Sequence, residues 1–183
     1  MNELGLLRSI RDDELELMLS WRNAPSVRSK MYTRQVISLE SHKAWWADIQ
    51  NRKDQKYFMY EFAGVPTGIV AFNDIDLVNG NSAWAFYASP EAVKGTGSRM
   101  EFLALECAFG ELGLHRLCCE VLDFNAPVVA LHKKFGFKEE GVKRQHHKMD
   151  DGFHDVICLG ILAQEWEKTR EVMQLNLLEK VRS

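Results

Sequence analysis

The stretch with the clearest chemical signature is a loop with two glycines, Gly95 and Gly97, flanked by Lys94 and Arg99. It follows a short apolar run and leads into a helical pattern. Glycine lets the backbone turn tightly and brings its N–H groups close to a ligand. The first N–H groups of a helix have no partner within it, and the helix dipole makes that end positive. The sequence therefore predicts a site for an anion such as a pyrophosphate.

Other interpretations of this loop depend on spacing. A third glycine at the spacing of the dinucleotide fingerprint is lacking, and there is no G-x-x-x-x-G-K-[ST] motif for a nucleoside triphosphate. An interpretation without a ligand is a capping box formed by Ser98 and Glu101, which would satisfy the free N–H groups of the helix. The loop alone favours neither the anion site nor the capping box.

Length and composition limit the classes of protein. We expect a single domain over residues 1–183. A net charge of -3 gives no general attraction to nucleic acid or to an anionic membrane, so an anion site has to be local. No apolar run approaches the ~20 residues of a membrane helix. The four cysteines form no C-x-x-C pair, so we expect reduced cysteines, no metal site and a cytoplasmic protein.

Hydrophobic periodicity and turn residues predict the elements that position the loop. The expected strands are 4–9, 57–63, 67–74, 82–88, 115–122, 137–149 and 153–162. The expected helices are 15–21, 26–31, 39–50, 98–112, 125–134 and a C-terminal tail helix at about 163–181. This order predicts a mixed α/β (α+β) sheet with helices on its faces.

Two spaced motifs now suggest a family. The strand, glycine loop and helix at 83–112 stand where Q/R-x-x-G-x-G/A stands in the GCN5-related N-acetyltransferase (GNAT) superfamily. Asn125, followed by His132 and Phe135-Gly136-Phe137, is similar to the family's N-x-x-A-x-x-L-Y-x-x-x-G-F segment. The chain resembles this superfamily over almost its whole length. The resemblance implies a GNAT fold with a central, mostly antiparallel twisted sheet, helices on both faces, and acetyl-CoA as co-substrate.

The resemblance also implies which residues bind acetyl-CoA. The backbone of the loop would hold the pyrophosphate, and the free edge of the strand before it would pair with the pantetheine arm. The implied cofactor-binding residues are Ala88, Lys94, Gly95, Thr96, Gly97, Ser98, Arg99 and Asn125. Ala92 stands where the family usually has Gln or Arg, so Lys94 and Arg99 are the expected substitutes. For Asn125, the alternative is an N-cap on the helix that follows, with Pro127 near its first position.

His132 is the first catalytic candidate, because it stands where many family members have a tyrosine general acid. An imidazole exchanges protons near neutral pH, so it suits protonation of the leaving thiolate. The alternative is a surface histidine beside Lys133 and Lys134. Tyr87, on the strand before the loop, is the second candidate. No general base stands out: Glu91, a bound water and direct attack by a partly neutral amine remain open.

A narrower resemblance concerns the amine that accepts the acetyl group. This resemblance rests on the segments Trp21-Arg22-Asn23, Val27-Arg28, Met31, Ile37-Ser38-x-x-Ser41-His42 and Phe86-Tyr87-Ala88-x-Pro90. These segments look like the acetyltransferases of pseudaminic acid biosynthesis, which are similar to the ribosomal-protein N-terminal acetyltransferases. The resemblance implies a UDP-linked amino-dideoxy sugar acetylated on its 4-amino group. A protein N-terminus as acceptor and a non-catalytic acyl-CoA-binding module are the alternatives.

Five residues are candidates for binding such a nucleotide-sugar: Arg22, Arg28, His42, Trp45 and Trp84. The arginine fork matches phosphate oxygens, and aromatic faces suit a uracil or a sugar ring. For the tryptophans the alternative is a place in the hydrophobic core. We expect the protein to act as a monomer or a homodimer, without nucleic-acid or membrane partners.

Overall fold

A computed structural model describes residues 3–182 of the chain. A seven-stranded sheet has the order β1-β2-β3-β4-β5-β7-β6. The strands are β1 Leu6–Ser9, β2 Lys56–Phe62, β3 Val65–Asp76, β4 Asn81–Ala88, β5 Arg116–Leu122, β6 Lys138–Met149 and β7 Gly152–Leu162. All neighbouring strands are antiparallel except β4 and β5, which are parallel. The predicted mixed, mostly antiparallel sheet is confirmed.

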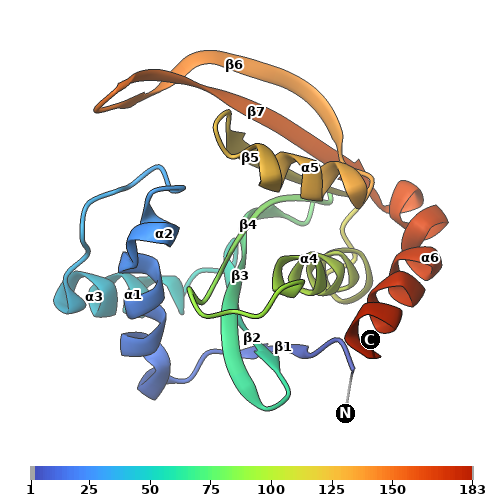
Figure 1. Cartoon of the computed structure of the whole chain (residues 1–183), viewed down its shortest axis with the longest axis horizontal. Coiled ribbons are helices and arrows are strands. Elements are labelled where there is room, and N and C mark those ends of the chain that lie inside the picture. The colour runs from blue at the N-terminus through green and yellow to red at the C-terminus, as the bar shows by residue number, and fades with distance from the viewer. Residues whose placement is uncertain (1–2, 183) are drawn as a thin grey trace.

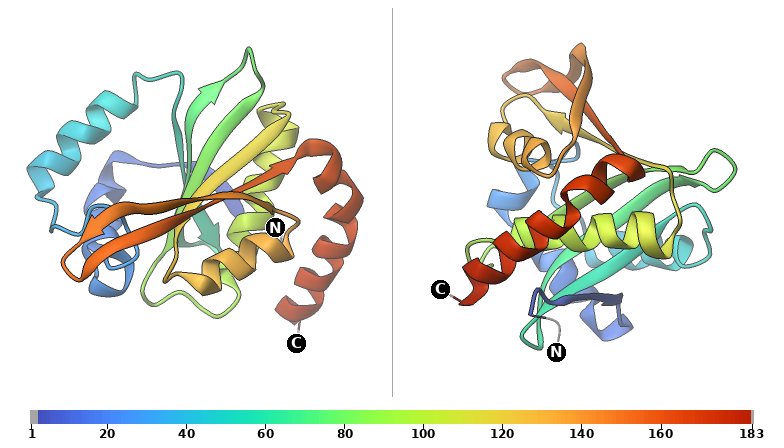
Figure 2. Two further views of the ribbon diagram at one scale, coloured as in Figure 1. Left: turned by 90° about the horizontal axis from the view of Figure 1, so that it is seen from above. Right: turned by 90° about the vertical axis from the view of Figure 1, so that its right-hand side faces the viewer.

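Helices cover both faces of this sheet, as predicted (Figure 1). The helices are η1 Asp12–Glu14, α1 Leu15–Asn23, α2 Pro25–Arg28, α3 Leu39–Ile49, α4 Thr96–Glu106, η2 Cys107–Glu111, α5 Ala126–Lys134 and α6 Ala163–Arg182. Figure 2 shows α1 and α3 on one side of the sheet and α4 and α6 on the other. None of these helices, within residues 3–182, is long and apolar enough to cross a membrane.

The sheet separates two hydrophobic cores. Successive side chains of a strand point to opposite faces. Tyr60 and Val70 therefore pack with α4, α5 and α6, whereas Met59 and Ile69 pack with α1 and α3. All four side chains are fully buried. Each core side chain of this size stabilises the fold by about 1.5–3 kcal/mol, so both helical layers are held firmly against the strands.

The β4–β5 junction interrupts the sheet. The two strands pair only through residues 81–83 of β4 and 116–118 of β5. Beyond that point β5 stays paired with β7 along its whole length, while residues 84–88 of β4 have a partner only in β3. Figure 1 shows β5, α5 and the β6–β7 hairpin as an upper arm that leaves the β1–β4 layer. One edge of β4 is therefore left unpaired.

The tail helix α6 packs against α4. Trp166, with an exposed fraction of 2%, lies edge-on to Phe102 of α4 at 5.5 Å between ring centroids. The indole N–H of Trp166 and the guanidinium of Arg170 both donate hydrogen bonds to the carboxylate of Glu106. These contacts fix the helix whose first turn carries the glycine loop.

Replacing Trp166 by alanine lowers the free energy of unfolding by about 3–5 kcal/mol, because it removes a fully packed aromatic side chain between α6 and α4. Urea unfolding followed by circular dichroism measures this change. Val172 on the same helix is 61% exposed, so Val172→Ala is the control and changes stability by less than about 0.5 kcal/mol. Equal, small effects of the two substitutions would show that α6 is not packed on α4.

Candidate active site

The glycine loop forms the first turn of α4, which begins two residues earlier than predicted. Gly95 precedes the helix with a φ of 89°, in the left-handed region that glycine adopts readily. The Thr96 N–H donates to Val93, and the Arg99 N–H donates to Gly95. For the N–H groups of Gly97 and Ser98, no acceptor lies in the part of the chain that the structure describes. Two donors at the positive end of the helix are thus open to an anion.

The capping-box alternative is wrong. Because α4 starts at Thr96, Ser98 lies within its first turn, and no side chain caps the helix. Glu101 is fully buried and turns towards α5 instead of reaching back to the loop. The free N–H groups are therefore not satisfied by the neighbouring side chains.

The expectation that the Arg99 side chain contacts a pyrophosphate needs correction. Its guanidinium is buried and donates hydrogen bonds to the Tyr60 hydroxyl and the Thr96 hydroxyl, each at 3.0 Å. It also lies 4.1 Å from the centroid of the Phe62 ring. The Arg99 side chain thus packs between the loop and β2, and Lys94 is the exposed basic side chain beside the two glycines.

The unpaired edge of β4 borders a cleft of about 310 Å³ between β4 and β5. Residues 84–88 of β4 and 119–122 of β5 form its sides, and Asn125 and His132 lie at its α5 end. Gly97 brings the start of α4 to the same place, since a Cβ there would meet Leu131 of α5 at 3.4 Å and Phe86 of β4 at 3.6 Å. The start of α4 thus adjoins the strand and the helix that line the cleft.

The Asn125 side chain does not cap the helix that follows it. It occupies the N-cap position of α5, but its side chain makes no capping hydrogen bond. Its carboxamide has no hydrogen-bond partner within residues 3–182, and the half-buried residue lines the cleft. The N-cap alternative is therefore not realised, and the amide is available to a ligand.

His132 is not the surface residue of the alternative interpretation, because its exposed fraction is only 2%. Its Nδ1 lies 2.8 Å from Oε1 of Glu101. The rings of Trp84, Phe86 and Phe137 surround the imidazole at centroid distances of 5.4, 6.0 and 5.2 Å. Its Nε2 has no protein partner in the described chain, and the residue lines the cleft. One ring nitrogen is thus held and the other is available.

The Glu101 carboxyl is a functional candidate for which the sequence offered only a capping box as a role. Burial raises its pKa, and the hydrogen bond with His132 acts in the opposite direction. The available signal was its position between Met100 and Phe102 on a helix whose neighbouring side chains are buried. A carboxyl on such a face needs a polar partner from another element.

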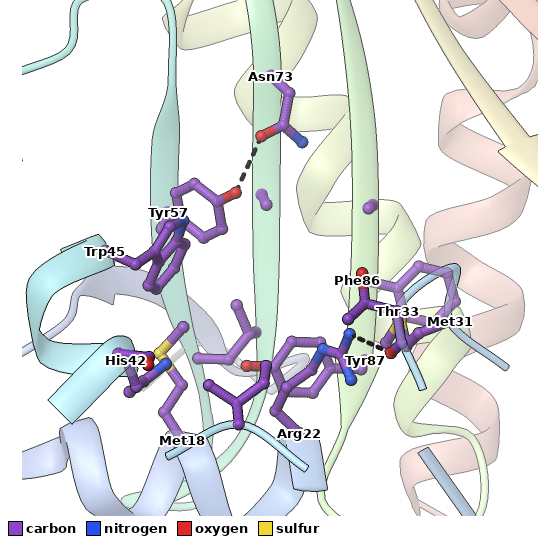
Figure 3. A pocket seen from close by; sticks show the side chains of 15 residues that line it. Met18, Arg22, Met31, Thr33, His42, Trp45, Tyr57, Asn73, Phe86 and Tyr87 are labelled. Carbon is purple, nitrogen blue, oxygen red and sulfur yellow. Dashed lines mark hydrogen bonds between the residues drawn. The ribbon is translucent and has the colours of Figure 1, made fainter. Parts of the chain in front are cut away.

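A second cavity, of about 440 Å³, lies on the opposite face of β4 (Figure 3). Its walls come from α1, α3, the segment 31–37 and strands β2–β4. The lining residues are Met18, Arg22, Met31, Thr33, Ile37, Ser41, His42, Trp45, Tyr57, Ile69, Ala71, Asn73, Ala85, Phe86 and Tyr87. Met31 and residues 85–87 line both this cavity and the cleft. The two spaces therefore meet at β4.

The charge that lines this second cavity is positive. Arg22 is its one charged lining residue, and none of the lining side chains, all within residues 3–182, is a carboxylate. One Arg22 nitrogen donates to the Thr33 carbonyl at 2.9 Å, whereas Nη1 is enclosed without a partner. Burial lowers the pKa of Arg22. The cavity is therefore suited to a neutral or anionic ligand.

His42 is buried in the wall of this cavity, and Tyr87 is half-buried there with its hydroxyl enclosed. The His42 ring stacks on Trp45, with 5.2 Å between centroids. Burial lowers the pKa of His42, and the charge of Arg22 lowers it further. Burial raises the pKa of the Tyr87 hydroxyl, which has no partner in the described chain. Both side chains are thus neutral at neutral pH.

The structure does not bring all five expected substrate-binding residues together. Arg28 lies in a separate groove beside the β6–β7 turn and donates to the Arg34 carbonyl. Trp84 is 3% exposed and lies in the cleft, stacked on Phe86. Only Arg22, His42 and Trp45 share the second cavity. No group of three or more potential metal-ligating side chains is found within residues 3–182.

The chain is similar in sequence to known acetyltransferases. A family model described as an acetyltransferase (GNAT) domain matches residues 6–138. The uncharacterized N-acetyltransferase YokL, derived from an SPbeta prophage of Bacillus subtilis, is 29% identical over 126 residues, which are 67% of this chain and 70% of YokL. Acetyltransferase PseH of Campylobacter jejuni is 24% identical over 137 residues, 75% of this chain and 85% of PseH.

The solved structures show the same fold. The spermidine N-acetyltransferase of Vibrio cholerae, in complex with CoA and spermine, superposes with a TM-score of 0.86 and 21% sequence identity. The match covers 91% of this chain and 99% of that enzyme.

Replacing Asn125 by alanine raises the Kd for acetyl-CoA, the co-substrate that the resemblance implies, by about 3–10-fold, the value of one hydrogen bond. Isothermal titration calorimetry measures this change. The thermal midpoint stays within about 2 °C, because the side chain caps no helix. A loss of stability with unchanged affinity would assign Asn125 to α5 instead of to the ligand.

Proposed function

The chain belongs to the GNAT acetyltransferase family, and we propose that its acceptor is the 4-amino group of a UDP-linked amino-dideoxy sugar. Its activity is that of an acetyl-CoA-dependent N-acetyltransferase. The observation that carries the acceptor proposal is the second cavity, which joins the cleft at β4 and is lined by Arg22 but, among residues 3–182, by no carboxylate. Similarity to acetyltransferase PseH supports the same proposal.

Charge distinguishes this acceptor from a polyamine. A spermidine-like acceptor is a polycation and needs carboxylates along its site, whereas placing it beside the half-buried guanidinium of Arg22 costs several kcal/mol. A diphosphate, in contrast, matches the arginine fork of Arg22. The stacked faces of His42 and Trp45 suit a uracil or sugar ring.

The residues around the cleft fit acetyl-CoA, which supplies the activated thioester. In our proposal, the free edge of β4 at residues 84–88 binds the pantetheine arm as an added strand. The open N–H groups of Gly97 and Ser98, together with Lys94, bind the pyrophosphate. The Asn125 carboxamide bonds the same arm from the α5 side.

Catalysis takes place where the cleft meets the second cavity. Binding from opposite faces of β4 places the acceptor amine next to the thioester, and such positioning supplies much of the rate. His132 donates the proton of Nε2 to the leaving sulfur. Tyr87 lines both spaces, and its hydroxyl, kept protonated by burial, serves to orient the amine as a neutral hydrogen-bonding group.

We expect the purified protein to acetylate a UDP-4-amino-4,6-dideoxy sugar with a kcat/KM at least about 100-fold above that for spermidine, given the cost of like charges in the cavity. Thiol release from acetyl-CoA is measured with the sugar nucleotide, spermidine and a ribosomal-protein N-terminal peptide. Acetylation of spermidine or the peptide without the sugar would reject this acceptor. Binding of acetyl-CoA without turnover of any amine would indicate a non-catalytic module.

Arg22→Gln provides a residue-level test of the same acceptor. Loss of a charged hydrogen bond to the diphosphate raises the KM for the sugar nucleotide by about 10–100-fold, while the KM for acetyl-CoA stays unchanged. Arg52→Gln is the matched control, because Arg52 pairs with Asp54 on the surface and touches neither cavity. Equal effects of the two substitutions would remove Arg22 from acceptor binding.

A further inference from the structure

A buried carboxyl and a buried imidazole face each other between α4 and α5. Glu101 is fully buried, His132 is 2% exposed, and Oε1 of Glu101 lies 2.8 Å from Nδ1 of His132. Oε2 of Glu101 has no partner in the described chain. The carboxyl therefore has one polar contact, and that contact is with the ring whose second nitrogen borders the cleft.

The proton balance of the transfer explains why His132 needs Glu101 to act as a general acid. If a neutral imidazole gave away its Nε2 proton, it would become an imidazolate, which is inaccessible near neutral pH. The ring must therefore hold a proton on Nδ1 when Nε2 gives up its own. Either the ring starts as a cation balanced by the carboxylate, or the protonated carboxyl passes its proton to Nδ1 as Nε2 loses its proton. In both cases the starting pair is neutral overall.

We propose that Glu101 is the positioning residue of the reaction, sharing one proton with Nδ1 of His132 so that the Nε2 proton is the one delivered to the cleft. The inference rests on the proposed role of His132 in acetyl transfer. The amine nitrogen forms the amide bond, the carbon–sulfur bond breaks, and the Nε2 proton moves to the sulfur. The proton lost by the amine nitrogen returns to Nε2 through water, and the pair is restored.

The groups packed directly around the imidazole are aromatic or neutral apart from Glu101, whereas Lys30, Tyr87 and Glu120 line the cleft that Nε2 borders. Trp84 and Phe86 of β4 present aromatic rings to the imidazole. Cys119 of β5 interacts electrostatically with Glu101, and burial raises the pKa of its thiol, which keeps it neutral. Lys133 and Lys134 of α5 are exposed. An isolated imidazolium in this cage would lack a counter-charge, so removing the carboxylate makes the protonated ring less stable.

The test is Glu101→Gln, which keeps the shape of the side chain and removes its charge. We expect kcat to fall about 10–100-fold, with the KM for acetyl-CoA changed less than about threefold. The alkaline limb of the kcat–pH profile moves to lower pH, because the ring loses its second proton earlier. The assay uses any amine that the wild-type protein acetylates, so failure of the proposed acceptor leaves this test valid.

A second readout needs no turnover. Nitrogen-15 NMR of the histidine rings, with His132 assigned by its loss in His132→Gln, follows each ring nitrogen against pH. In the wild type we expect the ring to carry its proton on Nδ1, and none on Nε2, once the Nε2 proton has been lost; in Glu101→Gln, Nε2 loses its proton at lower pH. A neutral wild-type ring with its proton on Nε2 and none on Nδ1 after that loss would overturn the proposal, even if the variant does not fold.

Glu106→Gln is the matched control on the same helix. Its carboxylate bonds Trp166 and Arg170 on the far side of α4 from the cleft. We expect lower thermal stability, with the wild-type kcat–pH profile retained. A folded Glu101→Gln protein with the wild-type profile and ring titration, or a Glu106→Gln protein with the same pH shift, would overturn a specific role for Glu101.

Discussion

The short parallel pairing of β4 with β5 is the constraint on which the other features depend. Three residue pairs join the strands before they diverge, because β5 keeps its full pairing with β7 and β4 keeps its pairing with β3. The divergence leaves backbone donors and acceptors of residues 84–88 without a strand partner. An unpaired strand edge can pair with another extended chain. The unpaired edge of β4 lies in a cleft that a narrow ligand can enter.

The alternation of side chains along β4 then divides the chemistry between two faces. On the α4 and α5 face, Phe86 packs near His132 and the start of α4. On the α1 and α3 face, Tyr87 lines the cavity that contains Arg22. One strand thus separates the expected acyl donor from the expected amine, and a short exposed stretch of its backbone is where they meet. Rigid packing on both sides holds that meeting point in place.

Local sequence patterns predicted the strand, the glycine loop and the helix after it, because alternation, glycine geometry and helical spacing are properties of neighbouring residues. They did not predict contacts between distant segments. Ser98 and Glu101 match a capping box, yet Glu101 bonds a residue that lies 31 positions along the chain. Arg99 is drawn inward by Tyr60, 39 positions earlier. Arg28 and Trp84 resemble binding residues by type, but the fold places them outside the second cavity.

The most direct measurement is a crystal structure of the protein with CoA bound. We expect pantetheine to be hydrogen-bonded to the edge of β4 at residues 84–88, with the pyrophosphate at the N–H groups of Gly97 and Ser98 and the sulfur within hydrogen-bond reach of Nε2 of His132. A pyrophosphate bound elsewhere on the chain, or a sulfur out of reach of that nitrogen, would contradict this expectation.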